Sequence, residues 1–204
     1  HGFQLARLKL AERLFLREYE RCRKALGGTA HRPVCQMHLE RLAHPHYDAR
    51  LAGGEGHREV AKNIRSHNQK LCHMVLSLKP FGCMPSTQSD GAQAAVISRY
   101  ADMIYLPIET SGEGEINAHS RVQMALGEAR RKAREEFAAA LEATGRTLDE
   151  LRAFVARHPE LRSALSEVPK DTRYAGTAAN YVTHVAERMS GPAGASGSTS
   201  ARPR

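Results

Sequence analysis

The sequence contains no tryptophan, and aromatic residues make up only 5% of its 204 residues. Proteins that bind single-stranded nucleic acid stack the bases on aromatic side chains, and this chain offers few of them. The net charge of +8 would otherwise suggest a polyanionic partner. Half of that excess lies in residues 1–25, which hold seven Lys or Arg and three Glu. We therefore expect no nucleic-acid partner.

Long apolar runs are also lacking. No stretch of about 18 apolar residues occurs, so we expect no membrane-spanning segment and no membrane partner. A basic segment followed by an apolar one, as in a secretion signal, is absent as well. These absences predict a cytoplasmic protein. Because the chain begins at His1 rather than Met, we expect it to be part of a longer protein.

The four cysteines, Cys22, Cys35, Cys72 and Cys83, are widely spaced, and no C-x-x-C pair occurs. In a chain of this length they do not form a disulfide framework, which fits a reducing compartment. Cys22 shares the apolar stripe of a predicted helix, and we interpret it as a packing residue. Cys35 and Cys72 receive the same interpretation, the latter as the first residue of a strand.

Apolar residues that recur at steps of three and four predict an amphipathic helix over residues 3–26. Thr147-Leu148-Asp149-Glu150 has the pattern of a capping box that opens another helix. Residues 190–204 are rich in Gly, Ser, Ala and Pro and predict a disordered tail. Further helices are predicted at residues 33–44, 57–70, 116–143 and 175–189. The helix at 116–143 has a predicted apolar stripe of Val122, Leu126, Ala129, Ala133, Phe137 and Leu141.

Two short apolar runs, residues 72–78 and 103–108, are typical of strands that are covered on both faces. Residues 89–101 between them have a helical composition, with Ser89 as the predicted cap. Strand, helix and strand over this length form a βαβ unit, which we expect to be right-handed. The predicted fold class is α/β, with a Rossmann-like parallel βαβ core, long flanking helices and a helical C-terminal extension.

The same patterns divide the chain into three parts. Residues 1–144 are predicted to form the α/β domain, residues 145–189 the helical extension and residues 190–204 the tail.

Chemistry is expected where the two strands end, because ligands of open parallel sheets bind at the carboxyl edge. The first strand is followed by a loop that carries Cys83 and opens onto a helix. A helix N-terminus and the nearby Lys79 would favour the thiolate, the form that binds metal or attacks an electrophile. The pattern alone leaves open a loop cysteine without any role.

A second loop carries three carboxylates, Glu109, Glu113 and Glu115. They could bind a cation, act as a base or remain solvated, and Glu109 is distinguished because it ends an apolar strand directly. A third, Gly-rich loop at residues 53–56 precedes a helix, and whether it reaches the same edge is left open. No loop matches G-x-G-x-x-G or the Walker A pattern, so we predict that this chain alone neither binds nor hydrolyses ATP.

Three segments occur at these loops: GGEGHREVAK (53–62), SLKPFGCMPSTQSDGAQAAV (77–96) and LPIETSGEGEINAHSRVQMALGEARRKA (106–133). In this order they resemble the C-terminal region of acyl-CoA dehydratase activase-related proteins. That family includes the activators of 2-hydroxyglutaryl-CoA dehydratase and the benzoyl-CoA-reductase type ATPases. The resemblance covers roughly residues 5–137, and residues 145–204 fall outside it.

The resemblance implies a C-terminal segment of an ATP-dependent activator that supplies low-potential electrons to 2-hydroxyacyl-CoA dehydratases. Its partners would be such a dehydratase or the upstream activase modules, and ATP would bind only in a module absent from this chain. Cys83 would be a ligand of a 4Fe-4S cluster. Such a cluster usually takes about four cysteines, so the others would come from sequence outside this chain.

The same likeness assigns further residues to the carboxyl edge. Glu109 and Glu55 are the candidate catalytic residues. The candidate cofactor-binding residues are Lys79, Ser86, Asp90 and Arg121. Two alternatives stay open: a stand-alone domain that binds an acyl-CoA or another phosphate-bearing ligand, and a structural docking domain whose contact is the basic first helix.

Overall fold

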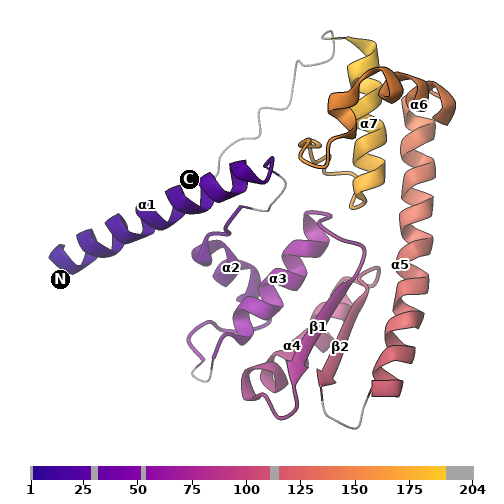
Figure 1. Cartoon of the computed structure of the whole chain (residues 1–204). Coiled ribbons are helices and arrows are strands. Elements are labelled where there is room, and N and C mark those ends of the chain that lie inside the picture. The colour runs from indigo at the N-terminus through magenta and orange to yellow at the C-terminus, as the bar shows by residue number, and fades with distance from the viewer. Residues whose placement is uncertain (1, 29–31, 52–53, 111–114, 192–204) are drawn as a thin grey trace.

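The computed structural model describes residues 2–28, 32–51, 54–110 and 115–191, which are mostly helical. Figure 1 shows the elements in chain order. They are α1 (Gly2–Ala25), α2 (Gln36–Ala43), α3 (Gly56–Asn68), β1 (Val75–Pro80), α4 (Met84–Arg99), β2 (Tyr105–Thr110), α5 (Glu115–Thr144), α6 (Leu148–Arg157), the 3-10 helix η1 (Pro159–Arg162) and α7 (Thr177–Ser190).

The two strands pair in parallel and form a two-stranded sheet within the described residues. Their register places Val75 opposite Tyr105 and Pro80 opposite Thr110. Because α4 connects them, the predicted βαβ arrangement of two neighbouring parallel strands is confirmed. Both strands begin two or three residues later than predicted, so Cys72 precedes β1 rather than opening it.

The connecting helix α4 starts earlier than predicted, at Met84, with Cys83 as its N-cap residue. Pro85 lies in the first turn, where its fixed φ suits a helix and its missing N–H costs no hydrogen bond. Ser89 is therefore not the cap, and the prediction for it is wrong. It is fully buried inside the helix, and its hydroxyl donates to Glu59 and to the carbonyl of Ser86.

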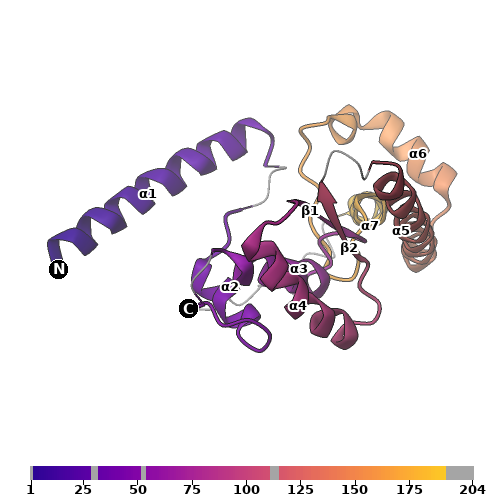
Figure 2. The ribbon, with the colours of Figure 1, turned by 90° about the horizontal axis from the view of Figure 1, so that it is seen from below.

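The sheet is covered unequally on its two faces. Helices α3 and α4 lie against one face and α5 lies on the other side (Figure 2). Ser77 and Lys79 point to the covered face, where they contact Glu59 of α3 and Asp90 of α4. Leu76 and Leu78, which alternate with them along β1, are 38% and 65% exposed. The strand thus has one polar, packed side and one apolar, open side.

The described residues form two large hydrophobic clusters and a small third one of Ala140, Tyr174 and Ala179. The first joins α2, α3 and α4 through buried residues such as Leu39, Val60, Ile64 and Val96. The second joins α5, α6, η1 and α7, and its buried members are Leu151, Leu161, Val182, Val185 and Ala186. The predicted apolar stripe of α5 is confirmed, because all its members are buried or half-buried: Val122, Leu126, Ala129, Ala133, Phe137 and Leu141.

Helix α1 departs from the prediction. It extends away from the other helices (Figure 1), and its stripe residues Leu8 and Phe15 are 67% and 66% exposed rather than buried. Its C-terminal end contacts the C-terminal extension, because the Arg23 guanidinium lies 3.8 Å from the carboxylate of Glu167. Arg23 is buried there, and its guanidinium donates to the carbonyl of Gly28 at 2.6 Å and to the carboxylate of Glu20. The amphipathic pattern therefore predicted the helix correctly and its burial wrongly.

The C-terminal extension is helical as predicted. The capping box at α6 is confirmed: the Thr147 hydroxyl accepts from the backbone N–H of Glu150, whose carboxylate accepts from the backbone N–H of Thr147. The domain boundary at residue 144 stays a prediction. The disordered tail was predicted to begin at residue 190, which is wrong because Ser190 is the last residue of α7, and residues 192–204 lie outside the described residues. None of the described helices is long and apolar enough to cross a membrane.

Candidate functional site at the carboxyl edge of the sheet

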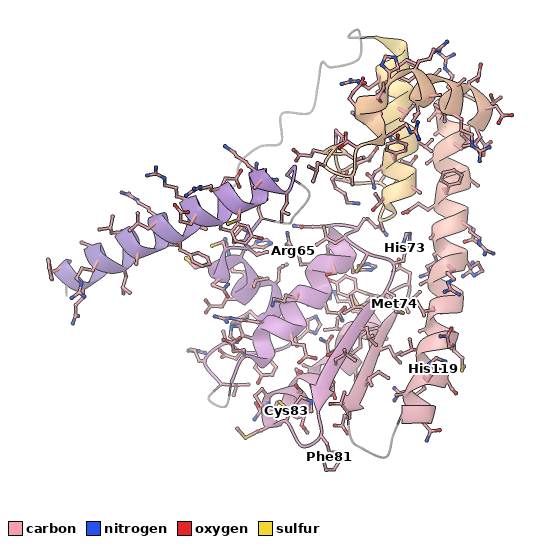
Figure 3. All side chains as sticks on the ribbon, in the orientation of Figure 1. Arg65, His73, Met74, Phe81, Cys83 and His119 are labelled. Carbon is pink, nitrogen blue, oxygen red and sulfur yellow. The ribbon has the colours of Figure 1, made fainter. Side chains whose placement is uncertain are left out.

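Cys83 lies where the sequence places it, in the loop between the carboxyl end of β1 and the start of α4 (Figure 3). Its thiol is half-buried, and the Ser86 hydroxyl donates to its sulfur at 3.5 Å. The loop needs a left-handed residue at Gly82, whose φ is +71°. On either side, Phe81 and Met84 are 75% and 58% exposed. The thiol thus sits at the surface between two exposed apolar side chains.

The Gly-rich third loop reaches the same edge, which the sequence had left open. Gly54 has a φ of +125°, and a Cβ built on it would lie 2.4 Å from Pro85 of α4. Tyr47 reinforces this contact, because its hydroxyl donates to Gln88 of α4 at 2.8 Å. Glu55 is the N-cap residue of α3, and its exposed carboxylate pairs with Arg58. A side chain at position 54 would push the loop away from the Cys83 helix.

Beneath this edge lies a polar cluster centred on Glu59 of α3, which sequence reasoning missed. Its carboxylate accepts from the hydroxyls of Ser77 and Ser89, each at 2.6 Å, and of Tyr105 at 3.1 Å. The ammonium of Lys79 is 3.7 Å from the same carboxylate. One side chain thereby connects α3 with both strands and with α4. No local pattern marks Glu59, because these partners come from distant parts of the sequence.

The cluster shifts the acidity of its members. Burial alone would raise the pKa of Glu59, but the hydrogen bonds from Ser77 and Ser89 and the charge of Lys79 outweigh it and lower the pKa. The pKa of Tyr105 is raised, chiefly by burial and also by the charge of Glu59. Glu59 is therefore an ionised acceptor, and the Tyr105 hydroxyl keeps its proton.

The thiol of Cys83 has a lowered pKa. The main causes are the hydrogen bonds from the side chain and backbone of Ser86, and the charge of Lys79 contributes. Desolvation and the charge of Glu59 act in the opposite direction, and the effect of Glu59 on the pKa is larger than that of Lys79, but the hydrogen bonds from Ser86 outweigh both. The predicted contribution of Lys79 is thus present, while Ser86 has the larger effect. The arrangement favours a thiolate at the surface of the loop.

Lys79 and Asp90, both predicted to bind a cofactor, pair with each other. The Lys79 side chain is 2% exposed, and its ammonium contacts the carboxylate of Asp90. An ammonium held between Asp90 and Glu59 is poorly placed to contact a ligand in solvent. Ser86 instead contacts the sulfur of Cys83. These contacts give Lys79 and Asp90 a structural explanation, while their predicted cofactor role stays a prediction.

The remaining predicted residues lie nearer β2. Glu109 is the exposed penultimate residue of β2 and pairs with Lys79 in the sheet register, and within the described residues its carboxylate has no hydrogen-bond or ion-pair partner. Arg121 of α5 donates to the carbonyl of Pro107 in β2 at 3.0 Å. Glu113 lies outside the described residues. The structure thus brings Cys83, Ser86 and the Gly54 loop together and leaves Glu109 free at the strand end.

The other three thiols do not join Cys83 in a metal site. Cys22 and Cys35 are exposed, which contradicts their interpretation as packing residues. Cys72 is exposed as a residue, although burial around its sulfur raises the thiol pKa. In the part of the chain that the structure describes, no three His, Cys, Asp or Glu side chains come together around a common point. These residues therefore do not fit a complete iron–sulfur cluster, and Cys83 would be a single ligand.

Searches against protein-family models, curated proteins and solved structures found no match to this chain.

The lowered pKa of Glu59 predicts an acid-dependent contribution to stability. A carboxyl group whose folded pKa lies below its ordinary value of 4.5 stabilises the fold above that pH. The contribution is lost as the pH falls through the lowered folded pKa. In chemical unfolding, Glu59→Gln should be less stable than the wild type at neutral pH, and the difference should shrink below pH 4.5. A difference that stays constant down to about pH 3 would contradict the proposed charge of Glu59.

Proposed function

We propose that this chain is a C-terminal segment of an ATP-dependent activator of 2-hydroxyacyl-CoA dehydratases, in which Cys83 serves as one thiolate ligand of a shared 4Fe-4S cluster. The carrying observation is the thiol itself, which lies at the N-terminus of α4 with a lowered pKa. A thiolate is the form that binds iron. The sequence resemblance in the three loop segments supplies the family.

The proposal includes a Rossmann-like core and a cytoplasmic location. A parallel βαβ unit is the arrangement from which such cores are built, and Cys83 lies directly beyond its first strand. ATP would bind in a module outside this chain. The remaining cluster ligands would come from that sequence or from the dehydratase, since the described residues offer one thiolate at this edge.

The surface around the thiol supports docking of another polypeptide. Phe81 and Met84 are exposed on either side of Cys83, and Leu78 is exposed on the open face of the neighbouring strand. Exposed apolar side chains around a functional group are typical of protein contact sites. A phosphate-bearing ligand is the weaker alternative. Lys79, which was predicted to bind a cofactor, forms ion pairs with Asp90 and Glu59 instead.

The test uses the activator that contains this segment, purified without oxygen. Its iron content, its acid-labile sulfide content and its visible absorption spectrum are measured. Cys83→Ala should lower the iron content and the activation of the dehydratase while leaving the circular dichroism spectrum unchanged. The matched control is Cys22→Ala, because the exposed thiol of Cys22 should be dispensable for iron binding and for activation. Full iron content and full activation in Cys83→Ala would overturn the ligand assignment.

A further inference from the structure

The C-terminal helices enclose an apolar groove that lies far from the Cys83 loop and that the proposed function does not use. Its walls come from α6, η1, α7 and the C-terminal part of α5, and in Figure 1 α6 and α7 stand beside that end of α5. The groove has a volume of about 360 Å³. Small-molecule pockets of proteins occupy roughly 300–1,000 Å³. The apolar lining includes Phe137, Leu151, Val155, Tyr181, Val182 and Val185.

The base of the groove is already part of the folded core. Val182 and Val185 are 5% and 1% exposed, so the groove is formed by packed helices. The hydroxyl of Tyr181 donates to the carbonyl of Leu161 at 2.9 Å, and its polar group is therefore satisfied. What remains open to an occupant is an apolar surface, on which burial of hydrocarbon is favourable by about 25 cal/mol per Å².

Two arginines, Arg152 of α6 and Arg162 of η1, are the charged members of the lining. Both are exposed, and Arg162 has no ion-pair partner among the described residues. Arg152 has only a distant one, since its guanidinium is 3.6 Å from the exposed carboxylate of Asp149. Guanidinium groups bind carboxylates through paired hydrogen bonds. The two arginines of the lining therefore favour an anionic group, and its apolar side chains favour a hydrocarbon chain.

We propose that this groove binds a long-chain carboxylate, with the alkyl chain against the half-buried side chains of Phe137, Val155 and Tyr181 and the carboxylate against Arg152 and Arg162. A neutral alkyl chain would form no ion pair with either guanidinium group, and a cationic one would be repelled by them. The site would give the C-terminal extension a ligand of its own, independent of the thiol at the sheet edge.

The test is calorimetric titration of the purified chain with dodecanoate, dodecanol and dodecyltrimethylammonium, each below its aggregation limit. Dodecanoate should bind at one site, and the other two should bind at least about tenfold more weakly, the loss expected for a charged hydrogen bond. The double variant Arg152→Gln, Arg162→Gln should bind dodecanoate more weakly by a similar factor. Arg157→Gln is the matched control, since Arg157 is exposed on the same helix and does not line the groove.

A second pair of variants tests the cavity itself. Ala156 and Ala153 are both exposed on α6, but only Ala156 lines the groove. Ala156→Phe should fill the groove and abolish dodecanoate binding, whereas Ala153→Phe should leave it unchanged; circular dichroism shows that each variant is folded. Equal binding of dodecanol and dodecanoate would overturn the carboxylate assignment. Failure of dodecanoate to bind would overturn the site, and dimerisation that Ala156→Phe abolishes would identify a second copy as the occupant.

Discussion

Lys79→Met should lower the free energy of unfolding by about 3 kcal/mol, the loss expected when one partner of a buried ion pair is removed. Lys79 is 2% exposed in its side chain and lies between the carboxylates of Glu59 and Asp90. Methionine keeps the length of the side chain but removes the charge, so two carboxylates remain close together without a cation. Chemical unfolding followed by circular dichroism measures the change.

Lys62→Met is the matched control, because Lys62 is an exposed lysine on α3. Its effect should stay within about 0.5 kcal/mol. Combining Lys79→Met with Asp90→Asn should cost less than the sum of the two single changes, since the second removes a carboxylate that the first left unpaired. Strictly additive effects, or a Lys79→Met variant as stable as the wild type, would show that this ion pair does not stabilise the fold.

Glu136→Ala should also destabilise the chain strongly, by about 3 kcal/mol, because it leaves several polar groups without a partner. The carboxylate of Glu136 on α5 accepts from the backbone N–H groups of Ala175 and Gly176, each at 2.6 Å. It also lies 2.9 Å from the ring nitrogen of His73, just before β1. Figure 3 places His73 at the end of β1 opposite to Cys83, where α5 passes the sheet. This carboxylate thus joins the sheet to the segment that leads into α7.

The neighbouring residue provides the control. Glu135 is 60% exposed and pairs only with Arg131 one turn away, so Glu135→Ala should cost about 0.5 kcal/mol or less. Thermal unfolding of the two variants should therefore differ by several degrees. Equal melting temperatures for Glu136→Ala and Glu135→Ala would mean that the contacts to Ala175, Gly176 and His73 contribute nothing measurable.

The candidate site was predicted in part. Cys83 could be located from its neighbours alone, because a strand end, a glycine and a helix start are all local features of the sequence. The effect of Ser86 on the thiol depends on its position in the first turn of α4. It could not be predicted, because the sequence placed the start of that helix too late. Glu59 could not be predicted, since its three hydroxyl partners meet it only after the helices α3 and α4 pack on the sheet.

The sequence by itself determined the helices, the two strands and their parallel pairing, because hydrophobic periodicity, caps and turn residues act over a few neighbouring positions. It did not determine which apolar faces are buried. The stripes of α1 and α5 look alike as patterns, yet that of α5 is covered and that of α1 is exposed. Burial depends on which elements meet in space, and so do the Glu59 cluster, the Glu136 contacts and the groove between α5, α6 and α7. Only the tertiary structure decided these, because their partners are brought together by packing rather than by the spacing of residues along the chain.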